Sequence, residues 1–82
     1  MPRYFFNLHA PGIEVPDPVG EELVDADAAF TAATRIARGL MAVKLDLGLN
    51  WLAARLDVTD EEGDTVFELP FVEVVDFGRE AH

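Results

Sequence analysis

The stretch RYFFNLH, residues 3–9, decides the fold. Tyr4, Phe6 and Leu8 fall on one side of an extended chain, and mostly polar side chains alternate with them on the other. Alternation over a stretch of this length predicts a β-strand with one buried face. Residues 10–12, Ala-Pro-Gly, are typical of a turn, because proline presets φ and glycine accepts a positive φ. A hairpin is therefore expected at the start of the chain.

The return strand of this hairpin is expected at residues 13–15. Pro16 and Pro18 follow it and cannot donate to a strand ladder, so the strand should be short and lie at an edge. A helix is expected next, over residues 26–47, with Asp25 placed to cap its free N–H groups. The apolar side chains of this segment recur at spacings of three and four, the helical period: Ala29, Ala33, Ile36, Leu40, Val43 and Leu47, widened by Phe30, Ala37 and Met41.

A second hairpin is expected after the helix. Residues 52–58 alternate between apolar and polar, residues 61–63 form a turn, and residues 65–69 form the return strand. Pro70 should interrupt the pairing, because proline has no N–H group to donate. Residues 71–77 are then expected to continue as a further extended segment.

These elements predict an α+β domain with the order ββαββ. A small antiparallel sheet of two hairpins, about four strands, with one long helix packed on one face, is the simplest way to bury both apolar stripes. No repeat or linker divides the chain, so residues 1–82 are expected to form a single domain. Its last residues, roughly five to ten, are expected to be a disordered tail.

The composition excludes several classes of function. The chain has no cysteine and no serine, which removes disulfides, thiolate metal sites and the usual nucleophiles of hydrolases. Six Lys and Arg stand against sixteen Asp and Glu, for a net charge of −10, so we expect no direct binding to nucleic acid or to an anionic membrane. No apolar run approaches the length of a spanning helix or a signal peptide, and the lack of cysteine fits a reducing compartment. The sequence favours a cytoplasmic protein that is not an enzyme.

The chain also resembles a known family. The resemblance is carried by the opening MPRYFF at residues 1–6, by Asp17, Gly20, Glu22, Leu23 and Asp25 at the entry to the helix, by Val58-Thr59-Asp60 and Gly63, and by Leu69-Pro70-Phe71. These residues are similar to a family of short bacterial proteins, common in alphaproteobacteria, known as a domain of unknown function. The resemblance covers the chain to about residue 72. It implies a small, soluble, intracellular bacterial protein, and it offers no catalytic residue to carry over and no function.

Carboxylates cluster in the turn of the second hairpin: Asp57, Asp60, Glu61, Glu62 and Asp64. An EF-hand calcium loop requires glycine at its sixth position and acids at its first and twelfth positions. With Gly63 at the sixth position, Val58 and Leu69 occupy the two anchor positions. No metal residue is therefore assigned, and the turn is interpreted as a solvated hairpin tip.

A second acidic run precedes the helix and gives a candidate docking surface for a basic protein partner: Glu14, Asp17, Glu21 and Glu22. Like charges gathered on one face attract an oppositely charged surface. The same run is also explained by solubility and by capping of the helix.

A candidate self-association face is expected on the side of the sheet opposite the helix. Its residues are Phe5, Val66, Val75 and Phe77. One helix leaves these apolar positions uncovered, and exposed apolar patches usually mark an interface. A homodimer, formed through this open face or through an edge strand, would cover them.

The function itself is unknown from the sequence, and two hypotheses remain. The preferred one is a non-enzymatic, acidic protein-interaction module that forms a homodimer. The alternative is a small-molecule or divalent-metal-binding protein, or a minimal enzyme, that uses His9 and the clustered carboxylates. No catalytic residue, cofactor or metal ligand is assigned in either case.

Overall fold

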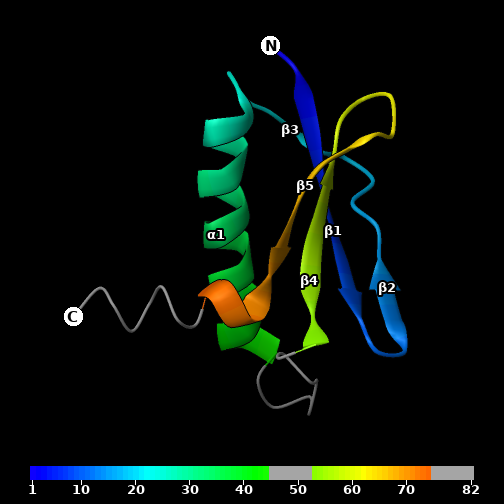
Figure 1. Ribbon diagram of the computed structural model, residues 1–82, viewed down its shortest axis with the longest axis vertical. Coiled ribbons are helices and arrows are strands. Elements are labelled where there is room, and N and C mark those ends of the chain that lie inside the picture. The colour runs from blue at the N-terminus through cyan, green and yellow to red at the C-terminus, as the bar shows by residue number, and fades with distance from the viewer. Residues whose placement is uncertain (45–52, 75–82) are drawn as a thin grey trace, which may run out of the picture.

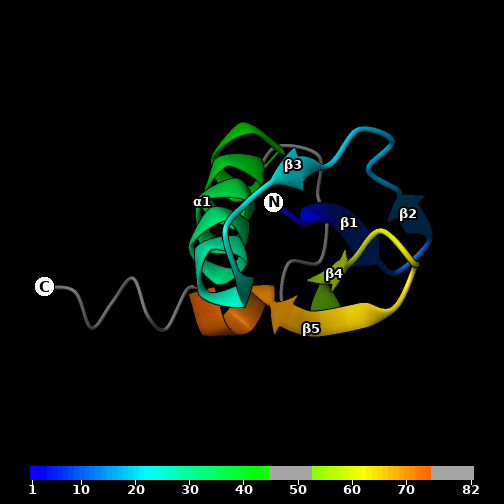
Figure 2. The ribbon, with the colours of Figure 1, turned by 90° about the horizontal axis from the view of Figure 1, so that it is seen from above.

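A computed structural model describes residues 1–44 and 53–74 of the chain. In these residues an antiparallel sheet is covered on one face by a helix (Figures 1 and 2). The strand order is β2-β1-β4-β5, and β3 pairs separately with β1. The elements are β1 (Arg3–Ala10), β2 (Ile13–Val15), β3 (Glu21–Glu22), α1 (Ala26–Lys44), β4 (Arg55–Thr59) and β5 (Thr65–Pro70). The predicted α+β class, with one helix on a small antiparallel sheet, is confirmed.

The alternation in β1 places its apolar side as predicted. Tyr4, Phe6 and Leu8 are buried and point toward the helix layer. Leu56 and Val58 of β4 lie directly opposite Leu8 and Phe6 in the ladder, and both are buried as well. Because a one-residue slip would turn all of these side chains to the outer face, burial of this face fixes the register.

Helix α1 packs on the sheet through small side chains. Four alanines on its inner side are buried: Ala29, Ala32, Ala33 and Ala37. Small residues allow a helix to approach the sheet closely, and larger side chains of the strands fill the space between them. The N–H of Ala28 donates to Asp25 Oδ1 at 2.9 Å, which confirms the predicted cap. The predicted helix end at residue 47 lies outside the described residues.

The far edge of β1 is covered by three short pieces, of which the sequence predicted only one. Strand β2 pairs with residues 8–10, as expected for the first hairpin. Strand β3 pairs with Arg3 and Tyr4 at the other end of β1 and was not predicted. The third piece is the carboxylate of Asp17, which accepts the N–H of Phe6 at 3.2 Å between the two strands. A side chain thus takes the place of a strand where neither β2 nor β3 reaches.

The end of β5 differs from the expectation. Pairing runs through Pro70, which lies opposite Arg55, and the N–H of Phe71 donates to the carbonyl of Ala54 at 3.0 Å. In an antiparallel ladder the backbone N–H groups of successive residues point alternately toward and away from the neighbouring strand. Because the N–H of Phe71 points toward β4, the nitrogen of Pro70 points away from it, and its missing N–H costs no ladder bond.

Residues 71–74 then form a helical turn, so the predicted extended segment is wrong for these four residues. Phe71 and Val74, three residues apart, are both buried on one side of this turn. A helical turn brings residues at this spacing onto one face, whereas an extended strand would point them to opposite faces. Burial of both side chains therefore favours the helical turn. Residues 75–77 lie outside the described residues.

Candidate functional site

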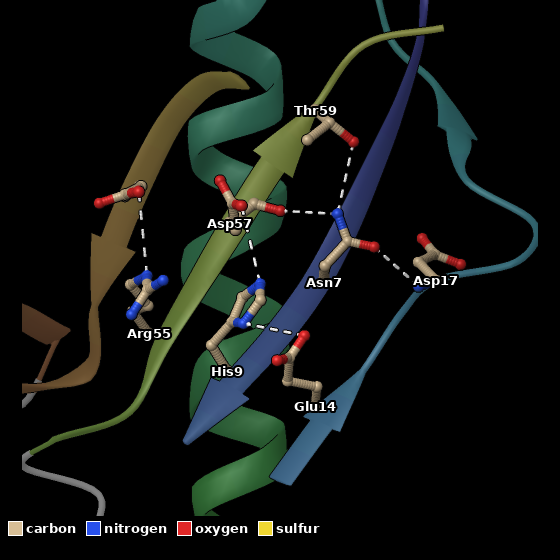
Figure 3. Close-up of polar contacts among 8 residues, drawn as sticks. Asn7, His9, Glu14, Asp17, Arg55, Asp57 and Thr59 are labelled. Carbon is tan, nitrogen blue, oxygen red and sulfur yellow. Dashed lines mark hydrogen bonds and ion pairs between the residues drawn. The ribbon is translucent and has the colours of Figure 1, made fainter. Parts of the chain in front are cut away.

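The outer face of the sheet, opposite α1, carries mainly polar side chains (Figure 3). They come from all four strands of the main ladder: Glu14 of β2, Asn7 and His9 of β1, Arg55, Asp57 and Thr59 of β4, and Glu68 of β5. Of the predicted self-association face, Phe5 is half-buried here and Val66 is 36% exposed. Val75 and Phe77 lie outside the described residues. Phe5 and Val66 therefore lie among polar side chains on this face.

His9 lies between two carboxylates that come from the neighbouring strands. Its Nδ1 is 3.7 Å from Glu14 Oε1 of β2, and its Nε2 is 3.7 Å from Asp57 Oδ2 of β4. Both distances exceed the length of a hydrogen bond, so these are electrostatic contacts that depend on protonation of the ring. Because the two carboxylates approach opposite ring nitrogens, they do not converge with the ring on one metal position. These contacts of His9 link β1 to both of its neighbours, β2 and β4.

The same row continues toward β5. Arg55 Nε is 3.8 Å from Glu68 Oε2, an ion pair between half-exposed side chains. Arg55 Nε and Asp57 Oδ1 are buried and have no hydrogen-bond partner. Ion pairs at such distances on a surface contribute little to stability. This row brings together two basic groups, His9 and Arg55, and three carboxylates, Glu14, Asp57 and Glu68.

Asn7 and Asp17 form a polar clamp that fixes the loop before β3. The N–H of Asp17 donates to Asn7 Oδ1 at 2.8 Å, and Asn7 Nδ2 donates to the carbonyl of Asp57 at 2.9 Å and to Thr59 Oγ1 at 3.3 Å (Figure 3). Asn7 therefore joins this loop to β4 across the face of β1. Every polar atom of its amide side chain is used inside the fold.

The carboxylate of Asp17 accepts three backbone N–H groups. Besides Phe6, the N–H groups of Val19 and Gly20 donate to its Oδ1 at 3.1 Å each. Burial on its own would raise the pKa of this carboxyl, but the N–H groups of Gly20, Phe6 and Val19 together lower the pKa below the ordinary 3.8. Asp17, predicted as part of an acidic docking surface, thus has a clear structural role.

The other residues of the predicted acidic docking surface also have contacts within the molecule. Glu22 Oε2 is 3.5 Å from Arg3 Nη2, and Glu21 Oε1 is 3.8 Å from Arg35 Nη2. Glu14 is the residue that contacts His9. Glu21 and Glu22 are neighbours on β3 and contact different arginines, whereas Glu14 lies on β2.

The tip of the second hairpin brings three carboxylates together. Ligand atoms of Asp60, Glu62 and Asp64 lie within 4.8 Å of one another. Asp60 Oδ1, however, accepts the N–H groups of Glu62 at 2.9 Å and of Asp64 at 3.0 Å. This side-chain turn explains why the cluster is compact without invoking an ion.

The flank of the molecule between α1 and β5 carries an exposed ridge, formed by Phe30 and Thr34 of α1, that the sequence interpretation missed. Phe30 was assigned to the buried stripe of the helix, yet its side chain is 50% exposed. Its ring contacts that of Phe67 with a centroid distance of 5.7 Å and an interplanar angle of 53°. The signal available in the sequence was its position, directly after Ala29, at the border of the apolar stripe.

A hollow lies on each side of this ridge. On the side of β5, a hollow of about 150 Å³ is lined by Phe30, Thr34, Leu69, Glu73 and Val74. On the outer side of α1, a wider hollow of about 330 Å³ is lined by Phe30, Thr31, Thr34, Arg35 and Arg38. Both views of the ribbon place the turn of residues 71–74 beside α1, where it forms the wall of the first hollow (Figures 1 and 2).

A further groove lies between α1 and β2. It has a volume of about 360 Å³ and is lined mainly by apolar side chains: Phe6, Leu8, Val15, Pro16, Asp17, Pro18, Ile36, Leu40 and Leu56. Val15 is half-exposed at its rim. The single helix therefore covers the middle of the inner face and leaves an open groove along each of its sides.

The fold and these surfaces define a small α+β domain whose outer sheet face is polar and whose helix flank is partly apolar. The chain belongs to the DUF6894 family, a domain of unknown function, whose family model matches residues 3–72. This match begins at the first residue of β1 and ends within the helical turn after β5. No curated protein and no solved structure matches the chain. In the described residues, no helix has both the length and the apolar character needed to cross a membrane.

Proposed function

We propose that this protein is a non-enzymatic interaction module that binds another protein chain through the ridge of Phe30 and Thr34 on helix α1. The observation that supports the proposal is the half-exposed ring of Phe30, with a hollow on each side of it. Aromatic side chains that meet pockets at the centre of an interface provide much of the binding free energy of protein complexes. The Phe30 ridge combines such a side chain with such hollows.

The contrast with the outer sheet face supports the choice of this surface. On that face Asn7 uses its polar atoms within the fold, as Asp17 does at the adjoining edge of β1, and His9 lies between two carboxylates. Groups engaged in this way gain little from a partner, because each new contact must replace an existing one. On the ridge, a partner would remove apolar surface from water, which is the main driving force of association.

The alternative function is binding of a divalent metal or a small molecule, or minimal catalysis, with His9 and the carboxylates as the working groups. It is supported by the compact Asp60, Glu62 and Asp64 cluster and by the contacts of His9. Calorimetric titration with calcium, magnesium and zinc tests its metal branch. Heat of binding at micromolar to millimolar metal that is lost in Glu62→Gln would favour the alternative.

The remaining features of the proposal come from the sequence. They are a homodimeric state, a cytoplasmic location, an alphaproteobacterial source with MPRYFF as the opening signature of the family, and a basic partner at Glu14, Asp17, Glu21 and Glu22. The basic partner takes second place, because each of these carboxylates already contacts a group of the same molecule.

Site-specific photo-crosslinking in cells tests the proposal. A benzophenone amino acid is placed at Thr34, beside Phe30, and as a matched control at Val66, on the rival outer face. We expect covalent adducts from position 34, identified by peptide mass spectrometry, that disappear when Phe30→Asp is added. Adducts equal to or fewer than those at position 66 would overturn the proposal.

A further inference from the structure

We infer that the partner of the Phe30 ridge is a second copy of this chain, related by a two-fold axis that passes close to Phe30. This inference rests on the proposed function and names its partner. In the resulting contact, Glu73 of each copy faces Arg35 and Arg38 of the other copy. The argument depends on how shape and charge are distributed around the ridge.

The ridge separates two sides of unlike charge. Phe30 and Thr34, one helical turn apart, line both hollows and therefore stand between them. The hollow toward β5 contains Glu73, which is exposed, and the hollow on the outer side of α1 contains Arg35 and Arg38. The carboxylate and the guanidinium groups thus lie on opposite sides of the same aromatic centre.

A two-fold axis that lies in the contact surface and runs along the ridge places each side against the opposite side of the other copy. A dimer of this kind is self-complementary only when a feature on one side of the axis fits the feature on the other side. The ridge meets this condition, because the rotation places the acidic side of one copy against the basic side of the second copy. It also places each Phe30 ring beside the hollow of its counterpart.

Local charge explains why a chain with a net charge of −10 would contact itself at this place. At most surfaces of such a protein, a second copy meets like charges and is repelled. Helix α1 carries Arg35 and Arg38 one turn apart, on the same surface as Phe30. Arg35 is 3.8 Å from Glu21 in an exposed pair, which is weak enough to share its cation with a further carboxylate.

Charge reversal with complementation tests this inference. We expect the wild-type chain to dimerise at high micromolar concentration, with a mass near twice 9.0 kDa by sedimentation equilibrium. The variant Glu73→Arg, and separately the double variant Arg35→Glu with Arg38→Glu, should each weaken the dimer about tenfold or more, because each places like charges face to face. An equimolar mixture of the two should recover the wild-type affinity as a heterodimer, because both contacts then pair opposite charges.

Glu73→Lys and Glu61→Lys form a matched pair for this experiment. Both carry the same charge change on an exposed residue, but Glu61 lies at the hairpin tip, away from the ridge. Only the change at Glu73 should weaken the dimer, and circular dichroism should show the same fold for both. This pair keeps the test decisive if the double arginine variant fails to fold.

Two results would overturn the inference. One is a wild-type chain that stays monomeric up to millimolar concentration, and the other is a dimer whose affinity is the same for Glu73→Lys and Glu61→Lys. If crosslinks from position 34 then identify a different protein, the inference fails and the proposed function stands. If position 34 yields no adducts above the control, both fail.

Discussion

The outer face of the sheet and the α1–β5 flank use their side chains in opposite ways. On the outer face and the adjoining edge of β1, Asn7 and Asp17 direct polar atoms to backbone groups of the same molecule. On the flank, Phe30 leaves half of its surface exposed and has unlike charges on its two sides. The more polar surface therefore stabilises the fold, whereas we propose that the more apolar one binds a partner. Variants on the two surfaces should therefore affect different measurements.

The largest effect is expected from Asp17→Ala. This change removes the acceptor of three backbone N–H groups, so the free energy of unfolding should fall by roughly 3 kcal/mol. Urea denaturation followed by circular dichroism measures it. Glu61→Ala, an exposed carboxylate at the hairpin tip, is the charge-matched control and should change stability little. Equal losses in the two variants would mean that net charge, and not the clamp, explains the effect.

A smaller loss is expected from Gly20→Ala. Gly20 has φ of 76°, and a Cβ there would lie 2.9 Å from Arg3 Cγ and from Phe5 Cε2. The expected loss of stability is roughly 2 kcal/mol, from backbone strain and the clash together. Gly12→Ala is a close control, because Gly12 has φ of 77° and open space around it. It should lose only the strain, about 1 kcal/mol, in the same thermal or urea unfolding assay.

The third prediction concerns pH and the clamp. The pKa of Asp17 is lower in the folded chain than its ordinary 3.8, so the folded state binds fewer protons than the unfolded state as pH falls through this range. Its contribution to stability is therefore complete above the ordinary value and is lost as pH drops through the folded pKa. Wild type should lose more stability than Asp17→Asn between about pH 5 and pH 2. The same loss of unfolding free energy with falling pH in both proteins would contradict this role of Asp17.

The smallest effect is expected from His9→Gln. The contacts of His9 with Glu14 and Asp57 are long and partly exposed, so their removal should change the free energy of unfolding by less than about 0.5 kcal/mol. Dimer affinity should not change, because His9 lies on the outer face. A large loss of dimer affinity in this variant would mean that the dimer interface lies on the outer face and not on the α1–β5 flank.

Local patterns explain what the sequence could predict. The alternation in residues 3–9 and the Asp25 cap depend on near neighbours in the chain, and both appear as expected. Strand β3 has only two residues, too short for any periodicity to indicate it.

The role of Asp17 could not be predicted for a related reason. Its carboxylate acts on Phe6, eleven residues earlier, in a gap that exists only once β2 and β3 are in place. A carboxylate that accepts backbone N–H groups and one that faces solvent look alike in a sequence. The exposure of Phe30 likewise depends on where β5 and the following turn lie relative to α1, which helical spacing does not determine.

Pro70 has a consequence for how this protein can aggregate. Strand β5 is an edge of the sheet, and the nitrogen of Pro70 faces outward, where a further strand would seek a donor. Glu68, directly opposite Asp57, adds a charge to the same strand. Fibril growth requires each strand to offer an unbroken set of donors to the next, and this edge does not. The β5 edge therefore disfavours growth by backbone pairing.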